Sequence, residues 1–244
     1  MDWNWTLLLL SVVIMAIAKT GFGGSLGILA MPIMAAAIGA REAVGTMLPL
    51  LCLTDVVGLC YYWRAWRTRS VLPFLPGAAI GIMLGSLLLN DIPEEQLRHF
   101  IGAAALAFMV LHTSGKADWL KEKSWGANWQ VGFVAGILTG IISTLAHVGG
   151  LVTTMYLLPL GLSNRMFVAT ATMIFLVVNF LKVTPYLAMD LIQADSLMTG
   201  VYLLPGIAIG AVIGFYLNRK TPPVWFNRII LIGITLSAVH LLFF

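Results

Sequence analysis

Charged residues are scarce in this sequence. Asp, Glu, Lys and Arg make up only 10% of the 244 residues, whereas hydrophobic residues make up 60%. A soluble domain usually carries about 25% charged residues, so this chain cannot cover a water-exposed surface. The apolar residues form long runs separated by short charged clusters, a pattern typical of a helical membrane protein with several spans. No soluble domain fits anywhere in it.

Features that would indicate other functions are also missing. Without a basic domain, a nucleic-acid partner is excluded. The two cysteines, Cys52 and Cys60, are about 12 Å apart along one helix, too far for a disulfide. The sequence contains no zinc-protease motif, no nucleophile elbow and no P-loop. It also lacks Cys and His residues at the spacing of metal ligands. The sequence therefore predicts no enzyme, no catalytic residues, no cofactor and no metal.

What the sequence does contain is an internal duplication. Leu75–Gly85 matches Leu204–Gly214 at seven of eleven positions. Further matches follow the same order in both halves: Gly23-Gly24 with Gly149-Gly150, Arg41 with Arg165, and Pro93 with Pro222. An ordered series of matches indicates a repeat. We therefore expect a first transmembrane repeat over residues 1–114, a linker over 115–128 and a second repeat over 129–244.

Each half contains five apolar elements, and all of them are expected to be helical. In the first half they are Trp5–Ala18, Leu26–Ile38, Val44–Trp63, Val71–Leu89 and Phe100–Thr113. In the second they are Trp129–Ala146, Leu151–Leu162, Phe167–Met189, Leu197–Leu217 and Phe226–Phe244. The first two elements of each half are short, and short runs suggest re-entrant segments. The predicted fold is all-α and polytopic, each half having a glycine-tipped helical hairpin and three spanning helices.

The charged loops predict that the two halves are inverted. Arg64–Arg69 carries three positive charges, whereas its repeat partner, Asp190–Asp195, carries only negative ones. In the next loop the signs reverse, with acidic residues prevailing in Asp91–Arg98 and cations in Arg219–Arg228. Because positive loops stay in the cytoplasm, the linker should be cytoplasmic and both termini outside. Inverted repeats with broken helices are typical of secondary transporters; the alternative is a duplicated membrane enzyme or assembly factor.

The glycine-rich hairpin tips predict an anion site. Irregular backbone at membrane depth is tolerated where it lines a wet cavity, and the helix after each tip begins with free N–H groups and a positive dipole end. Two such helix starts meeting from opposite faces would bind an anion. The expected binding residues are Gly23, Gly24, Ser25, Gly149, Gly150 and Thr153. Close helix packing is the alternative role, and it is the one we expect for the stripes Gly77/Gly81/Gly85 and Gly206/Gly210/Gly214.

Ionisable residues inside the apolar elements are costly and mark function. Lys19, before the first tip, is the candidate for a direct charge on the anion, with snorkelling to an interface as its alternative. His147, in the second tip, would bind substrate or carry a proton, or else be held by backbone carbonyls. Asp55 would repel an anion, so we expect it to couple protons or to pair with Lys19. Weaker candidates are Asn179, which is the repeat partner of Asp55, Lys182 one turn beyond it, and Arg41 and Arg165, which would equally serve as interfacial anchors.

These motifs resemble those of the sulfite exporter TauE/SafE family of membrane permeases. The resemblance is carried by Lys19-Thr20-Gly21-Phe22-Gly23-Gly24-Ser25 followed by Pro32, by His147-Val148-Gly149-Gly150 followed by Pro159, and by the duplicated layout over nearly the whole chain. His147-Val148 departs from the family pattern, which usually has a further small residue there.

The resemblance implies transport of sulfite, organosulfonates or related small anions across the bacterial inner membrane, driven by the proton gradient. The expected partners are a small anion, protons as the coupling ion and the lipid bilayer, and a homo-oligomer is compatible with the sequence. A passive anion channel and a membrane enzyme or assembly protein that uses His147 are the alternative functions.

Overall fold

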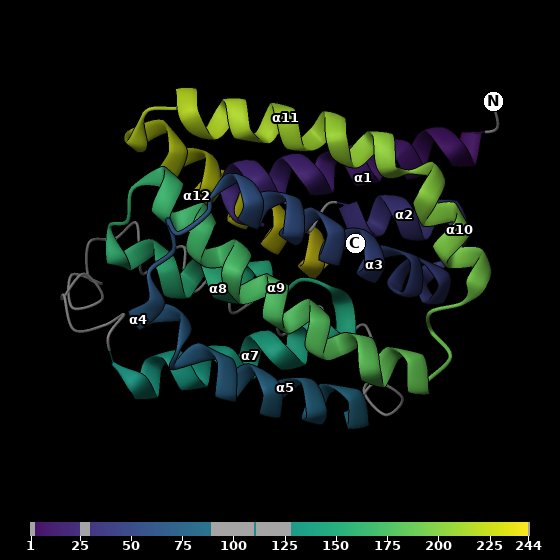
Figure 1. The fold of residues 1–244 in the computed structure, drawn as a ribbon, viewed down its shortest axis with the longest axis horizontal. Coiled ribbons are helices and arrows are strands. Elements are labelled where there is room, and N and C mark those ends of the chain that lie inside the picture. The colour runs from purple at the N-terminus through teal and green to yellow at the C-terminus, as the bar shows by residue number, and fades with distance from the viewer. Residues whose placement is uncertain (1–2, 25–29, 89–109, 111–127, 244) are drawn as a thin grey trace.

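The computed structural model describes residues 3–24, 30–88, 110 and 128–243, and all regular structure within them is helical (Figure 1). The first half contains α1 (Trp3–Phe22), α2 (Ala30–Ile38), α3 (Ala40–Tyr61), α4 (Thr68–Val71) and α5 (Phe74–Leu88). The second contains α7 (Trp129–Ala146), α8 (Gly150–Leu157), the 3-10 turn η4 (Leu158–Leu160), α9 (Asn164–Ala188), α10 (Ala194–Tyr202), α11 (Leu204–Lys220) and α12 (Pro223–Phe243). The predictions for Ser25, for the linker and for nearly all of Phe100–Thr113 lie outside the described residues.

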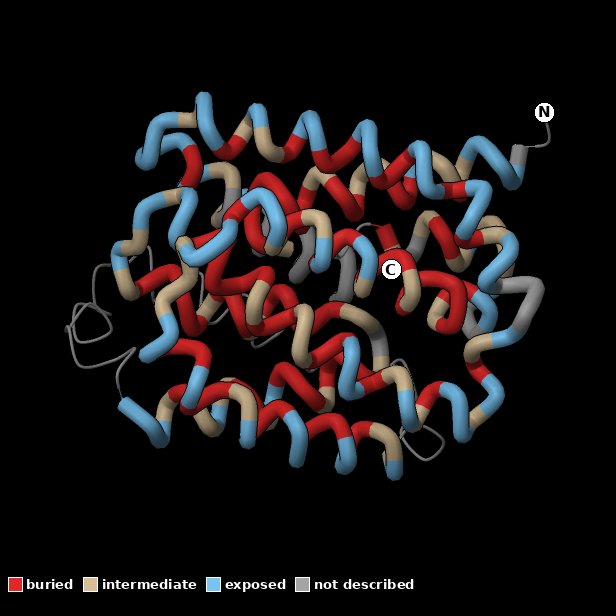
Figure 2. Tube along the Cα trace, in the orientation of Figure 1, coloured by how far each residue is buried: buried red, intermediate tan, exposed pale blue. Residues whose placement is uncertain are grey.

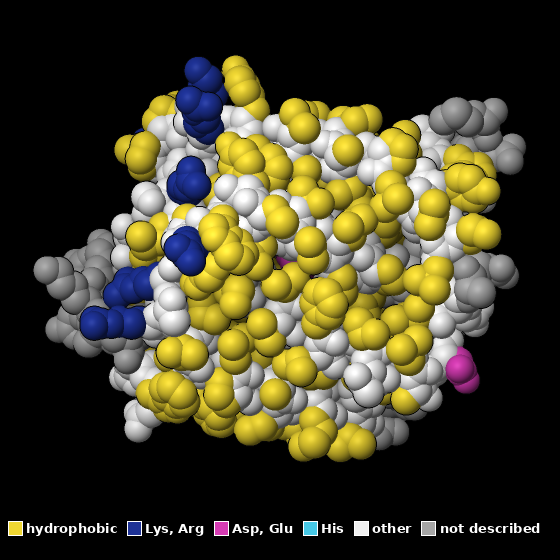
Figure 3. Space-filling view, viewed as in Figure 1, with side chains coloured by type: hydrophobic (Ala, Val, Ile, Leu, Met, Phe, Trp, Pro, Cys, Tyr) yellow, Lys and Arg dark blue, Asp and Glu magenta, His cyan; other side chains and the backbone are white. Residues whose placement is uncertain are grey.

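The predicted all-α membrane fold is confirmed. Within the residues that the structure describes, four segments are long and apolar enough to cross a membrane: Asn4–Phe22, Glu42–Tyr61, Thr68–Leu88 and Asn164–Ala188. Large apolar side chains such as Met83 and Leu87 on α5, and Val212 and Tyr216 on α11, are exposed on the outer helices. Figures 2 and 3 show the consequence, with exposed outer helix faces and a surface dominated by hydrophobic side chains. Lipid is the solvent that such a surface fits.

Two expectations about element length were wrong. The first helix was expected to be a short segment, Trp5–Ala18, but α1 runs for 20 residues to Phe22. The helix continues through Lys19 because the Asp55 carboxylate pairs with the Lys19 ammonium. It continues through Thr20 because the Thr20 hydroxyl donates a hydrogen bond to Ala16 O (2.7 Å).

The fourth element of the second half is divided. Leu197–Leu217 was expected as one helix, but α10 ends at Tyr202 and α11 begins at Leu204. In the first half, α4 ends at Val71 and α5 begins at Phe74. Pro205 lies in the first turn of α11, and Pro73 lies between α4 and α5. Proline lacks an N–H, so it starts a helix readily but interrupts its interior.

The glycine stripes pack helices across the two halves, as predicted. A Cβ atom at Gly77 or Gly81 would collide with backbone carbonyls of α7, and one at Gly210 would lie 2.6 Å from Val13 O of α1. The α5–α7 and α1–α11 pairs form two outer layers, with α3, α8 and α9 between them (Figure 1). Thus the fourth element of each half packs against the first element of the other half.

Equivalent positions of the proposed repeat make equivalent contacts. The Tyr62 hydroxyl donates to Thr20 O, and the Tyr186 hydroxyl donates to Thr144 O, both at 2.7 Å and both across 42 residues of sequence. The two tyrosines are separated by the same 124 residues that separate Asp55 from Asn179. Such a correspondence is expected when a sequence is duplicated and both copies adopt the same helix contacts.

The two central helices, α3 and α9, run in opposite directions. The backbone N–H of Arg67, just after α3, donates to Thr170 Oγ1 in the early part of α9 (3.0 Å). At the other end, Gly45 of α3 lies against Leu191 O, just after α9. Asn164, which begins α9, donates to Thr221 O at the end of α11 (2.8 Å). The two cationic segments, 64–69 and 219–220, therefore share one end, where Figure 3 shows Lys and Arg gathered.

This arrangement leads to a topological prediction. In a background without native cysteines, single cysteines at Arg69 and Lys220 should react with an impermeant maleimide only from the cytoplasm, and one at Asp190 only from outside. All three side chains are exposed, and positive loops remain cytoplasmic. Labelling of Arg69 and Asp190 positions from the same side would contradict the inverted arrangement.

Candidate functional site

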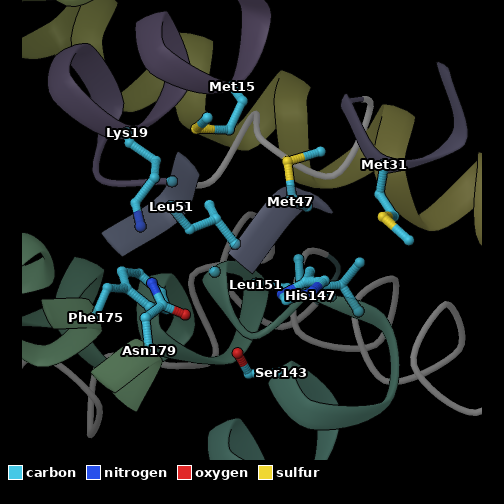
Figure 4. A pocket seen from close by; sticks show the side chains of 13 residues that line it. Met15, Lys19, Met31, Met47, Leu51, Ser143, His147, Leu151, Phe175 and Asn179 are labelled. Atoms are coloured by element: carbon cyan, nitrogen blue, oxygen red, sulfur yellow. The ribbon is translucent and has the colours of Figure 1, made fainter. Parts of the chain in front are cut away.

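A pocket lies between the two hairpin tips and takes its walls from both halves (Figure 4). The lining residues are Met15, Lys19, Gly24, Met31, Met47 and Leu51 from the first half, and Ser143, His147, Val148, Gly150, Leu151, Phe175 and Asn179 from the second. Methionine and leucine side chains form one wall, while Lys19, Ser143, His147 and Asn179 supply polar groups. A pocket of this kind, apolar with a few convergent polar groups, is typical of small-molecule sites.

The two tips touch each other directly. Gly23 and Gly24 have φ angles of 66° and 85°, a conformation that favours glycine, and the Gly24 N–H closes the end of α1 on Ala18 O (2.9 Å). Gly150 begins α8, and a Cβ atom there would lie 2.5 Å from Gly24 O. The backbone of the first tip therefore occupies the space that any other side chain at Gly150 would need.

Lys19 and Asp55 form a buried ion pair at the pocket. Lys19 Nζ lies 2.5 Å from Asp55 Oδ1, and the two residues are 6% and 1% exposed. Asn179 Nδ2 donates to the other carboxylate oxygen at 2.6 Å. The predicted pairing of Asp55 with Lys19 is thus present, and burial rules out snorkelling for Lys19. An ammonium has three N–H donors, so donors beyond the one facing Asp55 are available to a pocket ligand.

Lys182 lies behind the pocket wall and supports it. The side chain of Lys182 is fully buried, and its amine lies within hydrogen-bond distance of Ser143 O (3.2 Å), Ser143 Oγ (2.9 Å) and His147 Nδ1 (3.1 Å). The other ring nitrogen of His147, Nε2, lies 3.1 Å from Val44 O. Ser143 and His147 both line the pocket and both contact Lys182. A ligand in the pocket would therefore be linked to the Lys182 amine through these two residues.

This chain matches a known protein family over nearly its whole length. A family model described as Sulfite exporter TauE/SafE matches residues 8–241. The chain belongs to the sulfite exporter TauE/SafE family. It is therefore a multi-pass membrane transporter. No curated protein and no solved structure matches it.

The structure brings together only part of the set of site residues predicted for this TauE/SafE protein. Lys19, Gly24, His147, Gly150 and Asn179 line one pocket, with Asp55 and Lys182 directly behind them. Others have packing roles and do not line it: a Cβ at Gly23 would meet Phe167, one at Gly149 would meet Ser143 and Thr139, and Thr153 Oγ1 lies 3.4 Å from Thr139 Oγ1. Arg165 is exposed at the start of α9, and Arg41 belongs to the first turn of α3.

Ser143 also lines the pocket, although the sequence did not single it out. It occupies the position 124 residues after Lys19, the separation already evident between Arg41 and Arg165. The same separation places His147 opposite Gly23, and His147 has the glycine-like φ of 55°. The sequence comparison instead matched the glycine pairs two residues further on, because it aligned identical residues. Applying one constant separation upstream would have paired Ser143 with Lys19.

Proposed function

We propose that this protein is a secondary transporter that carries sulfite or a related organosulfonate across the bacterial inner membrane with proton coupling. The observation that carries the proposal is the pocket in which a buried lysine and both hairpin tips meet between the two halves. Family membership supports a sulfur-containing anion as substrate. Residues 1–114 and 129–244 would be the two inverted repeats, joined by a cytoplasmic linker at 115–128.

The groups around the pocket suit an anion with a small number of charges. Lys19 supplies an ammonium, and Ser143 supplies a hydroxyl. The start of α8 at Gly150 adds backbone N–H groups and the positive end of a short helix dipole. Charge-assisted hydrogen bonds of this kind contribute about 1.5–3 kcal/mol each. The methionine wall would pack against the uncharged part of an organosulfonate.

The placement of the pocket also suits a carrier. Its first-half and second-half walls touch through Gly24 and Gly150, so rocking of the α1–α11 layer against the α5–α7 layer would open it to either side. Transporters built from inverted repeats work in this way around a site near the membrane midplane. The engagement of both His147 ring nitrogens, by Val44 and Lys182, favours a structural histidine over an enzymatic one.

Reconstituted proteoliposomes test the proposal. Radiolabelled sulfite, sulfoacetate, taurine and sulfate should be compared for counterflow and for accumulation driven by an imposed pH gradient. A carrier is expected to show counterflow of at least one sulfur anion and accumulation above the outside concentration. Equilibration without accumulation or counterflow would identify a passive channel, and no movement of any of the four would defeat the proposal.

A further inference from the structure

Lys182 has a chemical environment unlike that of Lys19. Lys19 is paired with Asp55, whereas the hydrogen-bond partners of the Lys182 amine in the described part of the chain are a carbonyl, a hydroxyl and an imidazole. The Asp55 carboxylate is already engaged by Lys19 and Asn179. A fully buried ammonium that has no carboxylate among its hydrogen-bond partners is costly. Lys182 therefore needs an additional negative charge whenever it is protonated.

The tautomer of His147 follows from its partners. Val44 O can only accept a hydrogen bond, so Nε2 of His147 must carry the hydrogen. In the neutral ring, Nδ1 then presents a lone pair to the Lys182 amine, 3.1 Å away. Both contacts are satisfied with His147 uncharged, so the titratable member of this cluster is the amine and not the ring.

The Lys182 site satisfies both protonation states of its amine. As an ammonium, Lys182 can donate its three hydrogens to Ser143 O, Ser143 Oγ and His147 Nδ1. As a neutral amine, it can donate two hydrogens to the carbonyl and the ring, and accept the third bond from the Ser143 hydroxyl, which can rotate. Neither state leaves a buried polar group unpaired, which would cost about 1–3 kcal/mol.

Asp55 does not have this property. Protonation of Asp55 would leave the Lys19 ammonium buried without its carboxylate, and breaking a buried pair in this way costs about 3–5 kcal/mol. Lys182 can exchange a proton with little rearrangement, whereas Asp55 cannot.

We propose that Lys182 is the proton-carrying residue of this transporter: its amine is neutral when the pocket is empty and takes up one proton from the buffered solution as the anion binds. This inference rests on the proposed function. The bound anion supplies the missing negative charge, and release of the anion releases the proton, so both move together. Ser143 and His147 transmit the charge of the pocket to the amine because each contacts Lys182 and lines the pocket.

Other charged or titratable groups also face Lys182. They are Lys19 of α1, Cys52 and Asp55 of α3, His147 after α7, and Tyr186, whose ring centroid lies 5.9 Å from the amine on the same helix. Of these groups, Asp55 is the alternative proton carrier, because it is a titratable carboxylate next to the pocket. Asp55→Asn is therefore the matched rival variant.

Binding-linked proton uptake tests the inference. Calorimetry on the purified full chain, in pairs of buffers with different ionisation enthalpies, gives the number of protons taken up per bound anion. The probes are sulfoacetate and sulfate, which do not titrate near neutral pH, and sulfite corrected for its own titration. The wild-type protein is expected to take up about one proton per bound anion in the pH range where this uptake is largest. Lys182→Met should bind without proton uptake, and Asp55→Asn should retain the uptake.

Three results would overturn the inference. They are anion binding by the wild type without proton uptake at any pH, uptake that persists in Lys182→Met, or uptake lost in Asp55→Asn alone. If Lys182→Met does not fold, Ser143→Ala is tested instead. This substitution removes the hydroxyl that hydrogen-bonds to both the ammonium and the neutral amine of Lys182. It should therefore shift the pH range in which proton uptake occurs. An unchanged range would count against Lys182. Absence of binding by every probe would defeat the proposed function, whereas binding without uptake would defeat only this inference.

Discussion

Gly150→Ala is expected to abolish anion transport. The added Cβ would lie 2.5 Å from the carbonyl oxygen of Gly24, and this neighbour is backbone of the opposite tip and cannot rotate away. The two tips would be pushed apart at the point where both line the pocket. Counterflow in proteoliposomes should fall to the background of empty vesicles, and raising the anion concentration should not restore it.

Gly200→Ala is the matched control for this substitution. Gly200 lies within α10, and among the described residues a Cβ there would meet only Leu50 Cδ2 at 3.8 Å, an ordinary contact. This variant should transport as the wild type does. Gel filtration and circular dichroism must show that Gly150→Ala is folded. A folded Gly150→Ala protein with normal counterflow would show that the tips do not meet in the transporting state.

Lys19→Met is expected to weaken anion binding at least about ten-fold and also to destabilise the protein. Loss of a charge-assisted hydrogen bond costs about 1.5–3 kcal/mol, and about 1.4 kcal/mol corresponds to ten-fold in affinity. The free energy of unfolding should fall by about 3–5 kcal/mol because Asp55, which is 1% exposed, would be left as an unpaired buried carboxylate. Calorimetric titration and denaturant unfolding in detergent measure the two effects.

The double variant Lys19→Met/Asp55→Asn separates the two effects. It removes both charges, and the amide at position 55 still accepts a hydrogen bond from Asn179, so most of the lost stability should return. Anion affinity should stay low because the ammonium is absent. The exposed residue Lys220, changed to Met, is the control for removal of a cation. Normal affinity in Lys19→Met, or equal stability of the single and double variants, would contradict the roles assigned to Lys19.

Features of the molecule that depend on local sequence were predicted correctly, whereas some features that depend on contacts between helices were not. The glycine stripes were predicted correctly because a spacing of four places residues on one helix face. The length of α1 was not, because Lys19 looked like the polar end of an apolar run until its partner in α3 was known. Ser143 was overlooked because the glycine pairs were matched at a separation of 126 residues, whereas Lys19 and Ser143 are separated by 124 residues.

The sequence by itself determined that this protein is a helical membrane protein of the TauE/SafE family with glycine-tipped segments in each half. Hydropathy, loop charge and short motifs are local properties, so they can be recognised without knowing which helices touch. Only the tertiary structure decided that Asp55 neutralises Lys19, that Gly24 meets Gly150, and that Lys182 contacts Ser143 and His147. These contacts join residues of different helices, and the register between packed helices depends on how the side chains of both fill their shared interface.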